Sequence, residues 1–147
     1  MMYIEAPNTY SGQKPSLFLA GGITGCPDWQ QQMASKLVDK DIVVFNPRRK
    51  NFPISDPRAA HKQVKWEHDY LRKAGAISFW FSPETLNPIV LYELGTWSMT
   101  NKPIFVGIHP KYQRKRDVEL QMKFVRPAVK IVYSIDALVR QVRNHFK

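Results

Sequence analysis

The chain has 147 residues, 44% of them hydrophobic and 23% charged, a composition that is typical of one globular domain and argues against wholesale disorder. No stretch approaches the ~20 apolar residues of a membrane span, and the single cysteine, Cys26, excludes an intrachain disulfide and a cysteine-rich zinc site. Lys and Arg number 22 against 12 Asp and Glu, a formal net charge of +10 that favours anionic partners such as nucleotides, nucleic acid or an acidic protein.

The beginning of the chain predicts an arm followed by one domain. Residues 1–16 are polar and contain prolines, which predicts a loosely attached N-terminal arm ahead of a single domain over residues 17–147. Because the first residues lack the apolar core of a signal peptide and a lone cysteine suits a reducing compartment, we expect a cytoplasmic protein. The apolar run at residues 16–20 then predicts a buried strand that ends in the tight turn Gly21-Gly22.

A helix, a strand and a loop follow. Asp28 is positioned to cap the helix. The apolar residues of this helix recur at i, i+4 and i+8: Trp29, Met33 and Leu37. The β-branched run at residues 41–45, stopped by Asn46-Pro47, predicts the second strand. Residues 48–58 contain prolines and several basic side chains, which predicts a loop.

The alternation continues in the second half of the chain. The pattern predicts a helix over residues 59–74 and a third strand over residues 76–81. Asn87 is the expected cap of the next helix, because Pro88 occupies the first helical position, where proline is tolerated, and this helix should run to about Thr100.

Two more strands and one helix complete the pattern. Residues 102–108 and 129–133 predict the fourth and fifth strands, and residues 135–145 a last helix that Ser134 can cap. Continuous apolar strands that alternate with helices indicate a parallel sheet covered on both faces. The predicted fold class is therefore α/β, a Rossmann-like three-layer sandwich with five parallel strands, whose ligand site lies beyond the carboxyl ends of the strands.

Two carboxylates stand out as candidates for chemistry. Glu93 lies in a helix that is apolar nearly all round, so we expect it to be buried, where a lone carboxylate is costly unless it is paired or used. On a helical wheel Glu67 falls on the same stripe as Val64 and Leu71, which we expect to face the sheet. Two carboxylates in one crevice suit glycosidic chemistry. A buried ion pair of Glu93 with Arg or Lys is the alternative interpretation.

Other side chains carry weaker signals. The Gly21-Gly22 loop offers backbone N–H groups to an anion or a base edge, or is a simple turn. Arg48 can hold a phosphate or belong to a solvated charge run. Trp66 and Tyr70 form a flank of the 59–74 helix that suits a neighbouring subunit. Aromatic residues are not interleaved with the basic clusters, so a nucleic-acid track is weakly supported, and the histidines do not have zinc spacing.

These features resemble the nucleoside 2-deoxyribosyltransferase superfamily, in particular its nucleoside 2-deoxyribosyltransferase-like branch, from about Leu17 to Val142. The ordered set of motifs is more specific than any one of them. The motifs are FLAGGI at 18–23, FNPRR at 45–49, WEH at 66–68, FWFSPETLNPIVLYELG at 79–95 and VGIHP at 106–110.

The resemblance implies a flavodoxin-like five-stranded sheet and a glycosyl-enzyme mechanism without metal or cofactor. It implies that Glu93 is the nucleophile on C1′ of a deoxyribose and that Glu67 assists. It places Asn87 where related transferases carry an Asp near the nucleobase, which leaves the proton donor open. The residues that we expect to contact substrate are Gly21, Gly22, Ile23, Asp28, Trp29, Asn46, Arg48 and Phe81.

The leading hypothesis is cleavage of the N-glycosidic bond of a (2′-deoxy)nucleoside with transfer of the sugar to another nucleobase. A hydrolase of nucleoside 5′-monophosphates, a non-catalytic nucleotide-binding module and a basic nucleic-acid-associated protein are the alternatives. The resemblance also implies a homo-oligomer in which a neighbour completes the pocket. We expect no membrane partner.

Overall fold

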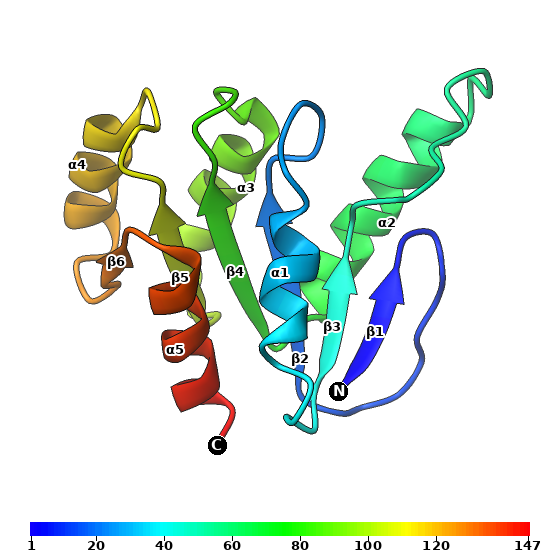
Figure 1. The fold of residues 1–147 in the computed structure, drawn as a ribbon, viewed down its shortest axis with the longest axis horizontal. Coiled ribbons are helices and arrows are strands. Elements are labelled where there is room, and N and C mark those ends of the chain that lie inside the picture. Colours follow the sequence, from blue (N-terminus) through cyan, green and yellow to red (C-terminus); the bar gives the residue numbers. More distant parts are fainter.

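A parallel sheet organises the chain and places helices on both of its faces. A computed structural model describes residues 1–147, and Figure 1 shows its six strands and five helices. The strands are β1 (Met2–Glu5), β2 (Ser16–Gly21), β3 (Val43–Asn46), β4 (Ala76–Phe81), β5 (Ile104–Ile108) and β6 (Ile131–Val132). The helices are α1 (Trp29–Ser35), α2 (Ala59–Lys73), α3 (Pro88–Ser98), α4 (Lys115–Val125) and α5 (Ile135–His145). The strand order is β1-β3-β2-β4-β5-β6, and every pairing is parallel.

Two apolar cores confirm the three-layer α/β class. Alternate residues of the central strands point to opposite faces, so Phe18 joins one core and Leu17 the other. α2, α3 and α4 cover the first face, and α1 and α5 cover the second (Figure 1). β2 connects to its neighbour β3 on one side, and β4 connects to its neighbour β5 on the other side. The connections therefore leave β2 and β4 in opposite directions, which leaves a crevice beyond the carboxyl ends of these two strands. No helix of the structure is long and apolar enough to cross a membrane.

The sheet has six strands instead of the expected five, because the start of the chain adds an edge strand. Met2 pairs with Val43 and Glu5 pairs with Asn46, in parallel register. Residues 1–16 are therefore not a loosely attached arm. The sequence pattern did not predict this strand because it is short, has polar neighbours and lacks a long apolar run. It forms because the distant strand β3 offers an edge for pairing.

The segment after β1 packs on α2 and covers the aromatic flank that we expected to meet a neighbouring subunit. Trp66 and Tyr70 stack with their ring centroids 4.4 Å apart and are almost fully buried within the chain. Trp66 donates its indole N–H to Asn8 O at 2.8 Å, and the Tyr10 backbone N–H donates to Tyr70 Oη at 2.6 Å. The prediction of a subunit contact at this flank is wrong, because the chain itself fills it.

The buried stripe of α2 is also rotated from the one expected. Val64 is 64% exposed, whereas Ala59, Trp66, Tyr70 and Leu71 are buried. The helix turns its aromatic side to the sheet because aromatic rings bury more apolar surface than one valine.

Side-chain caps begin α1 and α5, and one helix was not predicted from the sequence. Asp28 accepts from Gln31 N at 3.0 Å and Ser134 from Ala137 N at 3.1 Å, which confirms both predicted caps. The structure also contains a helix that the sequence pattern did not predict, α4, whose buried residues are Val118 and Met122.

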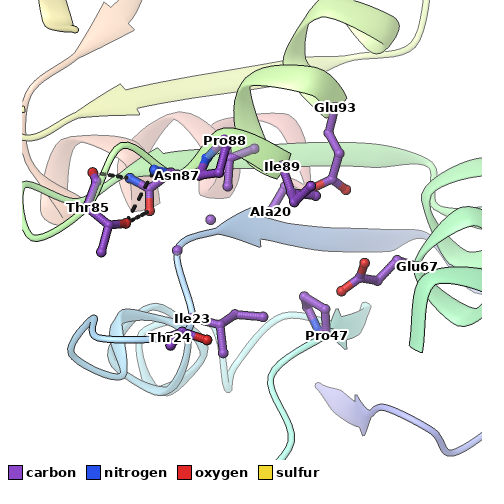
Figure 2. Close-up of a pocket in the computed structure, with 13 residues that line it drawn as sticks. Ala20, Ile23, Thr24, Pro47, Glu67, Thr85, Asn87, Pro88, Ile89 and Glu93 are labelled. Atoms are coloured by element: carbon purple, nitrogen blue, oxygen red, sulfur yellow. Dashed lines mark hydrogen bonds between the residues drawn. The ribbon is translucent and has the colours of Figure 1, made fainter. Parts of the chain in front are cut away.

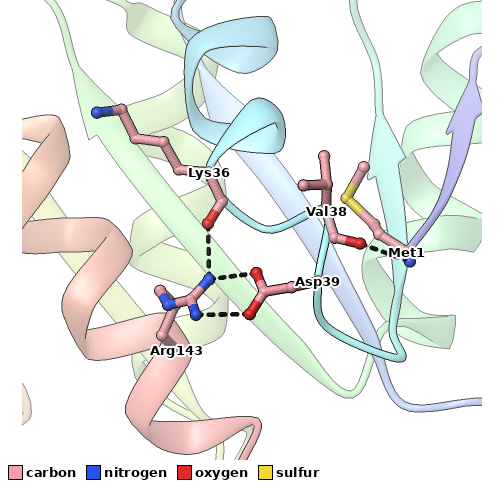
Figure 3. Close-up of polar contacts among 5 residues, drawn as sticks. All are labelled: Met1, Lys36, Val38, Asp39 and Arg143. Atoms are coloured by element: carbon pink, nitrogen blue, oxygen red, sulfur yellow. Dashed lines mark hydrogen bonds and ion pairs between the residues drawn. The ribbon is translucent and has the colours of Figure 1, made fainter.

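Figure 3 shows how α5 is tied to the segment between α1 and β3. Arg143 forms a two-pronged ion pair with Asp39, with Nη1 at 2.6 Å from Oδ1 and Nη2 at 2.7 Å from Oδ2. The same Nη1 donates to Lys36 O at 2.9 Å. Hydrogen bonding from Arg143 lowers the pKa of Asp39 to about 2.

The Arg143→Gln variant should raise the pKa of Asp39 from about 2 toward its ordinary value of 3.8. Because the folded-state pKa lies below the unfolded value, the stability from this pair is present above about pH 4 and is lost as the pH falls toward 2. Carboxyl ¹³C NMR titration measures the shift. Arg140→Gln, an exposed position on α5, is the control and should leave Asp39 unchanged. Identical Asp39 titrations in the parent and Arg143→Gln would contradict the assignment.

Candidate active site

A pocket of about 340 Å³ lies beyond the carboxyl ends of β2 and β4, at the predicted edge of the sheet. The β2–α1 loop, the β4–α3 loop, α2 and α3 form its walls (Figure 2). Of the residues expected to contact substrate, Gly21, Gly22 and Ile23 line it, as do the three expected catalytic residues, Glu67, Asn87 and Glu93.

The two glycines are required by close approach of the loop to its neighbours. A Cβ on Gly21 would lie 2.8 Å from Trp80 O and would overlap the Trp29 ring. A Cβ on Gly22 would lie 2.6 Å from Cys26 Sγ and would overlap Asn87 Oδ1. The backbone of this loop therefore reaches the pocket floor only because both side chains are hydrogen.

Trp29 and Arg48 hold this loop from behind and do not line the pocket. Trp29 is 2% exposed and donates its indole N–H to Gly22 O at 3.0 Å. Arg48 donates to Cys26 O and Pro27 O, each at 2.8 Å. Because its guanidinium is hydrogen-bonded to loop carbonyls, Arg48 stabilises the loop. It does not line the pocket, where we considered from the sequence that it could hold a phosphate.

The remaining expected substrate contacts also lie outside the pocket lining. Asp28 caps α1, and Phe81 is fully buried in the core. Asn46 donates to the Tyr3 hydroxyl and accepts from Arg48 N at 3.0 Å. The residues that sequence reasoning missed are Ala20, Thr24, Pro47, Thr85, Pro88, Ile89 and Val90. Only their position in the sequence could have indicated them, because most of them follow the carboxyl ends of adjacent parallel strands.

Asn87 does not cap α3 as predicted. Its backbone is left-handed, with φ 51° and ψ 57°, and its side chain makes no capping hydrogen bond. Instead, Nδ2 donates to Ser82 O at 3.1 Å and Thr85 O at 3.3 Å, and Oδ1 accepts from Thr85 Oγ1 at 2.9 Å. The amide is thus occupied in shaping the β4–α3 loop, and asparagine suits it because it tolerates the left-handed region and supplies two donors.

Glu93 and Glu67 project into the same pocket from α3 and α2 (Figure 2). Glu93 has no hydrogen bond and no ion pair, so the alternative of a buried pair with Arg or Lys is not what the structure contains. Glu67 accepts one hydrogen bond, from Gln63 Nε2 at 3.1 Å. No Lys, Arg or His lines this pocket.

Burial and mutual repulsion change the ionisation of the pair. Burial, followed by the charge of Glu67, raises the pKa of Glu93 to about 8. Burial also raises the pKa of Glu67, and the hydrogen bond from Gln63 opposes that rise. Near neutral pH, Glu93 is therefore largely protonated.

α3 is less buried than its apolar sequence suggested. Only Val90, Leu94 and Ser98 are buried, whereas Tyr92 is 75% exposed and Ile89 61%. A second cavity of about 380 Å³ lies between α2 and α3 and shares Glu67, Ile89 and Glu93 with the first. The carboxylate pair therefore lies where two cavities meet.

The sequence model described as nucleoside 2-deoxyribosyltransferase like matches residues 14–112, which is more than half of the chain. The chain belongs to the nucleoside 2-deoxyribosyltransferase-like family. The matched range contains β2 to β5 and every residue that lines the pocket, so family membership and the site concern the same part of the fold. No curated protein matches the chain.

The raised pKa of Glu93 should make the stability of this family member fall as the pH rises. The folded state retains a proton that the unfolded chain loses, so the free energy of unfolding decreases from about pH 5 to pH 8 and then levels off. Glu93→Gln should remove most of this decrease and be more stable than the parent at about pH 8. Urea unfolding across this range measures both.

Glu84→Gln is the matched control, because Glu84 is exposed in the neighbouring loop. It should keep the pH dependence of the parent. A parent stability that is flat or rises over this range would contradict the burial of an unpaired Glu93.

Proposed function

We propose that this protein cleaves the N-glycosidic bond of a 2′-deoxynucleoside through a covalent glycosyl-enzyme on Glu93 and transfers the sugar to another nucleobase. The observation that carries the proposal is the presence of two carboxyl groups, Glu93 and Glu67, in one cation-free pocket of a chain of this family. A glycosyl ester needs a free carboxylate oxygen at the pocket surface, and Glu93 has no competing partner within the chain.

One proton shared by the pair is enough for the first half of the reaction. Glu93 passes its proton to the Glu67 carboxylate, and an oxygen of the resulting Glu93 carboxylate bonds to C1′. The C1′–N bond breaks, its electron pair stays on the base nitrogen, and that nitrogen takes the proton from Glu67. The products are a neutral free base, a Glu93 glycosyl ester and an ionised Glu67. An acceptor base reverses these steps.

This proton route leaves Asn87 as a positioning residue rather than a proton donor. Its amide N–H groups are directed to Ser82 O and Thr85 O, and they hold the loop that forms one wall of the pocket. Glu67 lines the same pocket as Glu93, which supports Glu67 as the group that receives the proton and returns it to the base.

The charge of the pocket lining supports an uncharged nucleoside over a nucleoside monophosphate. Two acidic side chains line it and no basic one does, and Arg48 is hydrogen-bonded to loop carbonyls. A phosphate dianion beside two carboxyl groups gains little without a cation. We therefore place deoxynucleosides first and the monophosphate hydrolase second.

The parent protein should exchange the base of a deoxynucleoside when a second nucleobase is supplied. Glu93→Gln, which keeps the volume and removes the nucleophile, should lower kcat/KM by a factor on the order of 10³ or more. Because the reaction needs one proton on the pair, the pH profile of kcat/KM should be bell-shaped, with its alkaline limb near pH 8. Chromatography of the bases measures turnover, and mass spectrometry detects the added deoxyribosyl group on the Glu93 peptide.

Glu84→Gln again serves as the control and should retain parental activity. Folded parent protein that neither releases nor exchanges a base across a full panel of deoxynucleosides and their monophosphates would overturn the proposal. Nucleotide binding without turnover that Glu93→Gln leaves unchanged would support a binding module instead.

A homo-oligomer is the second part of this proposal, and α3 supports it. Ile89 and Tyr92 on this helix and Met99 directly after it are large hydrophobic side chains that are more than half exposed. Gly95, at mid-helix, has open space where a Cβ would be, so no contact within the chain explains a residue that costs ~1 kcal/mol relative to alanine. We propose that α3 of a second copy crosses this helix at Tyr92 and Gly95, where Tyr92 also lines the cavity that contains Glu93.

Tyr92→Glu should convert the parent dimer into a monomer, because it places a charge in an apolar contact. Sedimentation velocity at micromolar concentration measures the change. Val38→Glu is the matched control, since Val38 is 62% exposed on the opposite face of the sheet and should leave the assembly intact. A parent protein that sediments as a monomer would contradict this part of the proposal and leave the catalytic part standing.

A further inference from the structure

Gln63 is the one side chain that makes a hydrogen bond with the carboxylate pair. It lies one turn before Glu67 on α2, and its Nε2 donates to Glu67 Oε1 at 3.1 Å. The same Nε2 donates to Pro47 O at 2.7 Å, so both amide hydrogens are used. Pro47 lines the pocket opposite α3, and Gln63 therefore links Glu67 to the pocket wall.

The orientation of this amide has a single consistent solution. The Gln63 Oε1 atom is buried and has no hydrogen-bond partner, which is costly. Turning the amide over would place Oε1 against the Pro47 carbonyl and the Glu67 carboxylate, three acceptors without a donor. The N–H groups must therefore face Glu67, and the unsatisfied oxygen is the consequence.

We propose that Gln63 is a positioning residue that keeps the negative charge of the carboxylate pair on Glu67 and its shared proton on Glu93. An N–H donor stabilises a carboxylate more than a carboxylic acid, and only Glu67 has such a donor. The inference rests on the proposed function for its catalytic consequence: Gln63 sets the state from which the proton is passed before the attack on C1′.

The other titratable side chains near the pair do not take over this role. His68 and Arg72 of α2 and Tyr92 of α3 line the adjoining cavity with the two carboxylates. Arg72 Nη1 lies 2.8 Å from His68 Nδ1, and none of the three makes a hydrogen bond or ion pair with Glu67 or Glu93. The β2–α1 loop and Pro47 contribute no titratable side chain to the pocket lining.

Two substitutions of Gln63 should move the titration of the pair in opposite directions. Gln63→Met keeps the length of the side chain and removes the donor, so the lower of the two titration steps should rise by about one pH unit, a tenfold change in proton affinity. Gln63→Lys supplies a charged donor and should lower that step below the parental value. Carboxyl ¹³C NMR of glutamate-labelled protein measures both without any substrate.

The acid limb of kcat/KM should follow the lower titration step in each variant, while a merely structural role would change only the melting temperature. Gln32→Met, an exposed position on α1, controls for the chemical change. The inference would be overturned if the lower titration step of folded Gln63→Met lay within about 0.2 pH units of the parent, or if both variants shifted it in the same direction.

If Gln63→Met does not fold, Gln63→Lys decides alone. A lower titration step that does not fall in Gln63→Lys then overturns the proposal. Because the titration needs no turnover, a parent without activity refutes the proposed function and not the role of Gln63.

Discussion

Two carboxyl groups that share a pocket without a cation impose the main constraint on this protein. Moving the pKa of Glu93 from 4.5 to about 8 corresponds to a cost on the order of 5 kcal/mol for ionising it. That is comparable with the whole net stability of a typical domain. Burial of Glu93 is the first cause of this cost and the charge of Glu67 is the second, and a buried group with so strongly raised a pKa is where acid–base or nucleophilic chemistry is expected.

The scaffold meets this constraint by anchoring the helix of each carboxylate separately. α2, which carries Glu67, is held by the stacked Trp66 and Tyr70 and by the N-terminal segment that covers them. α3, which carries Glu93, directly follows Asn87, whose buried amide fixes the preceding loop. These buried contacts fix the positions of both helices, so Glu93 stays buried beside Glu67, and its burial and the charge of Glu67 together raise its pKa.

The large positive charge of the chain is used mostly away from the pocket. Arg48, Lys102 and Arg143 each donate to backbone carbonyls, of the β2–α1 loop, the end of α2 and the end of α1 respectively. These cations therefore satisfy carbonyl groups that helix ends and loops leave without partners. The net charge favoured anionic partners, but a net charge does not say where the charges lie, and the charged residues that line the pocket are both acidic.

The sequence by itself determined the fold class, the order of most elements and the two candidate carboxylates. These depend on local periodicity and on ionisable residue types that are rarely buried unless they are paired or functional. Only the tertiary structure decided that β1 joins the sheet, that Arg48 and Asn87 support loops, and that Gln63 contacts Glu67 and Pro47 together. These outcomes depend on which distant groups meet a side chain. Hydrogen-bond partners and the direction of a helix face are set by packing against the whole sheet, which no local pattern records.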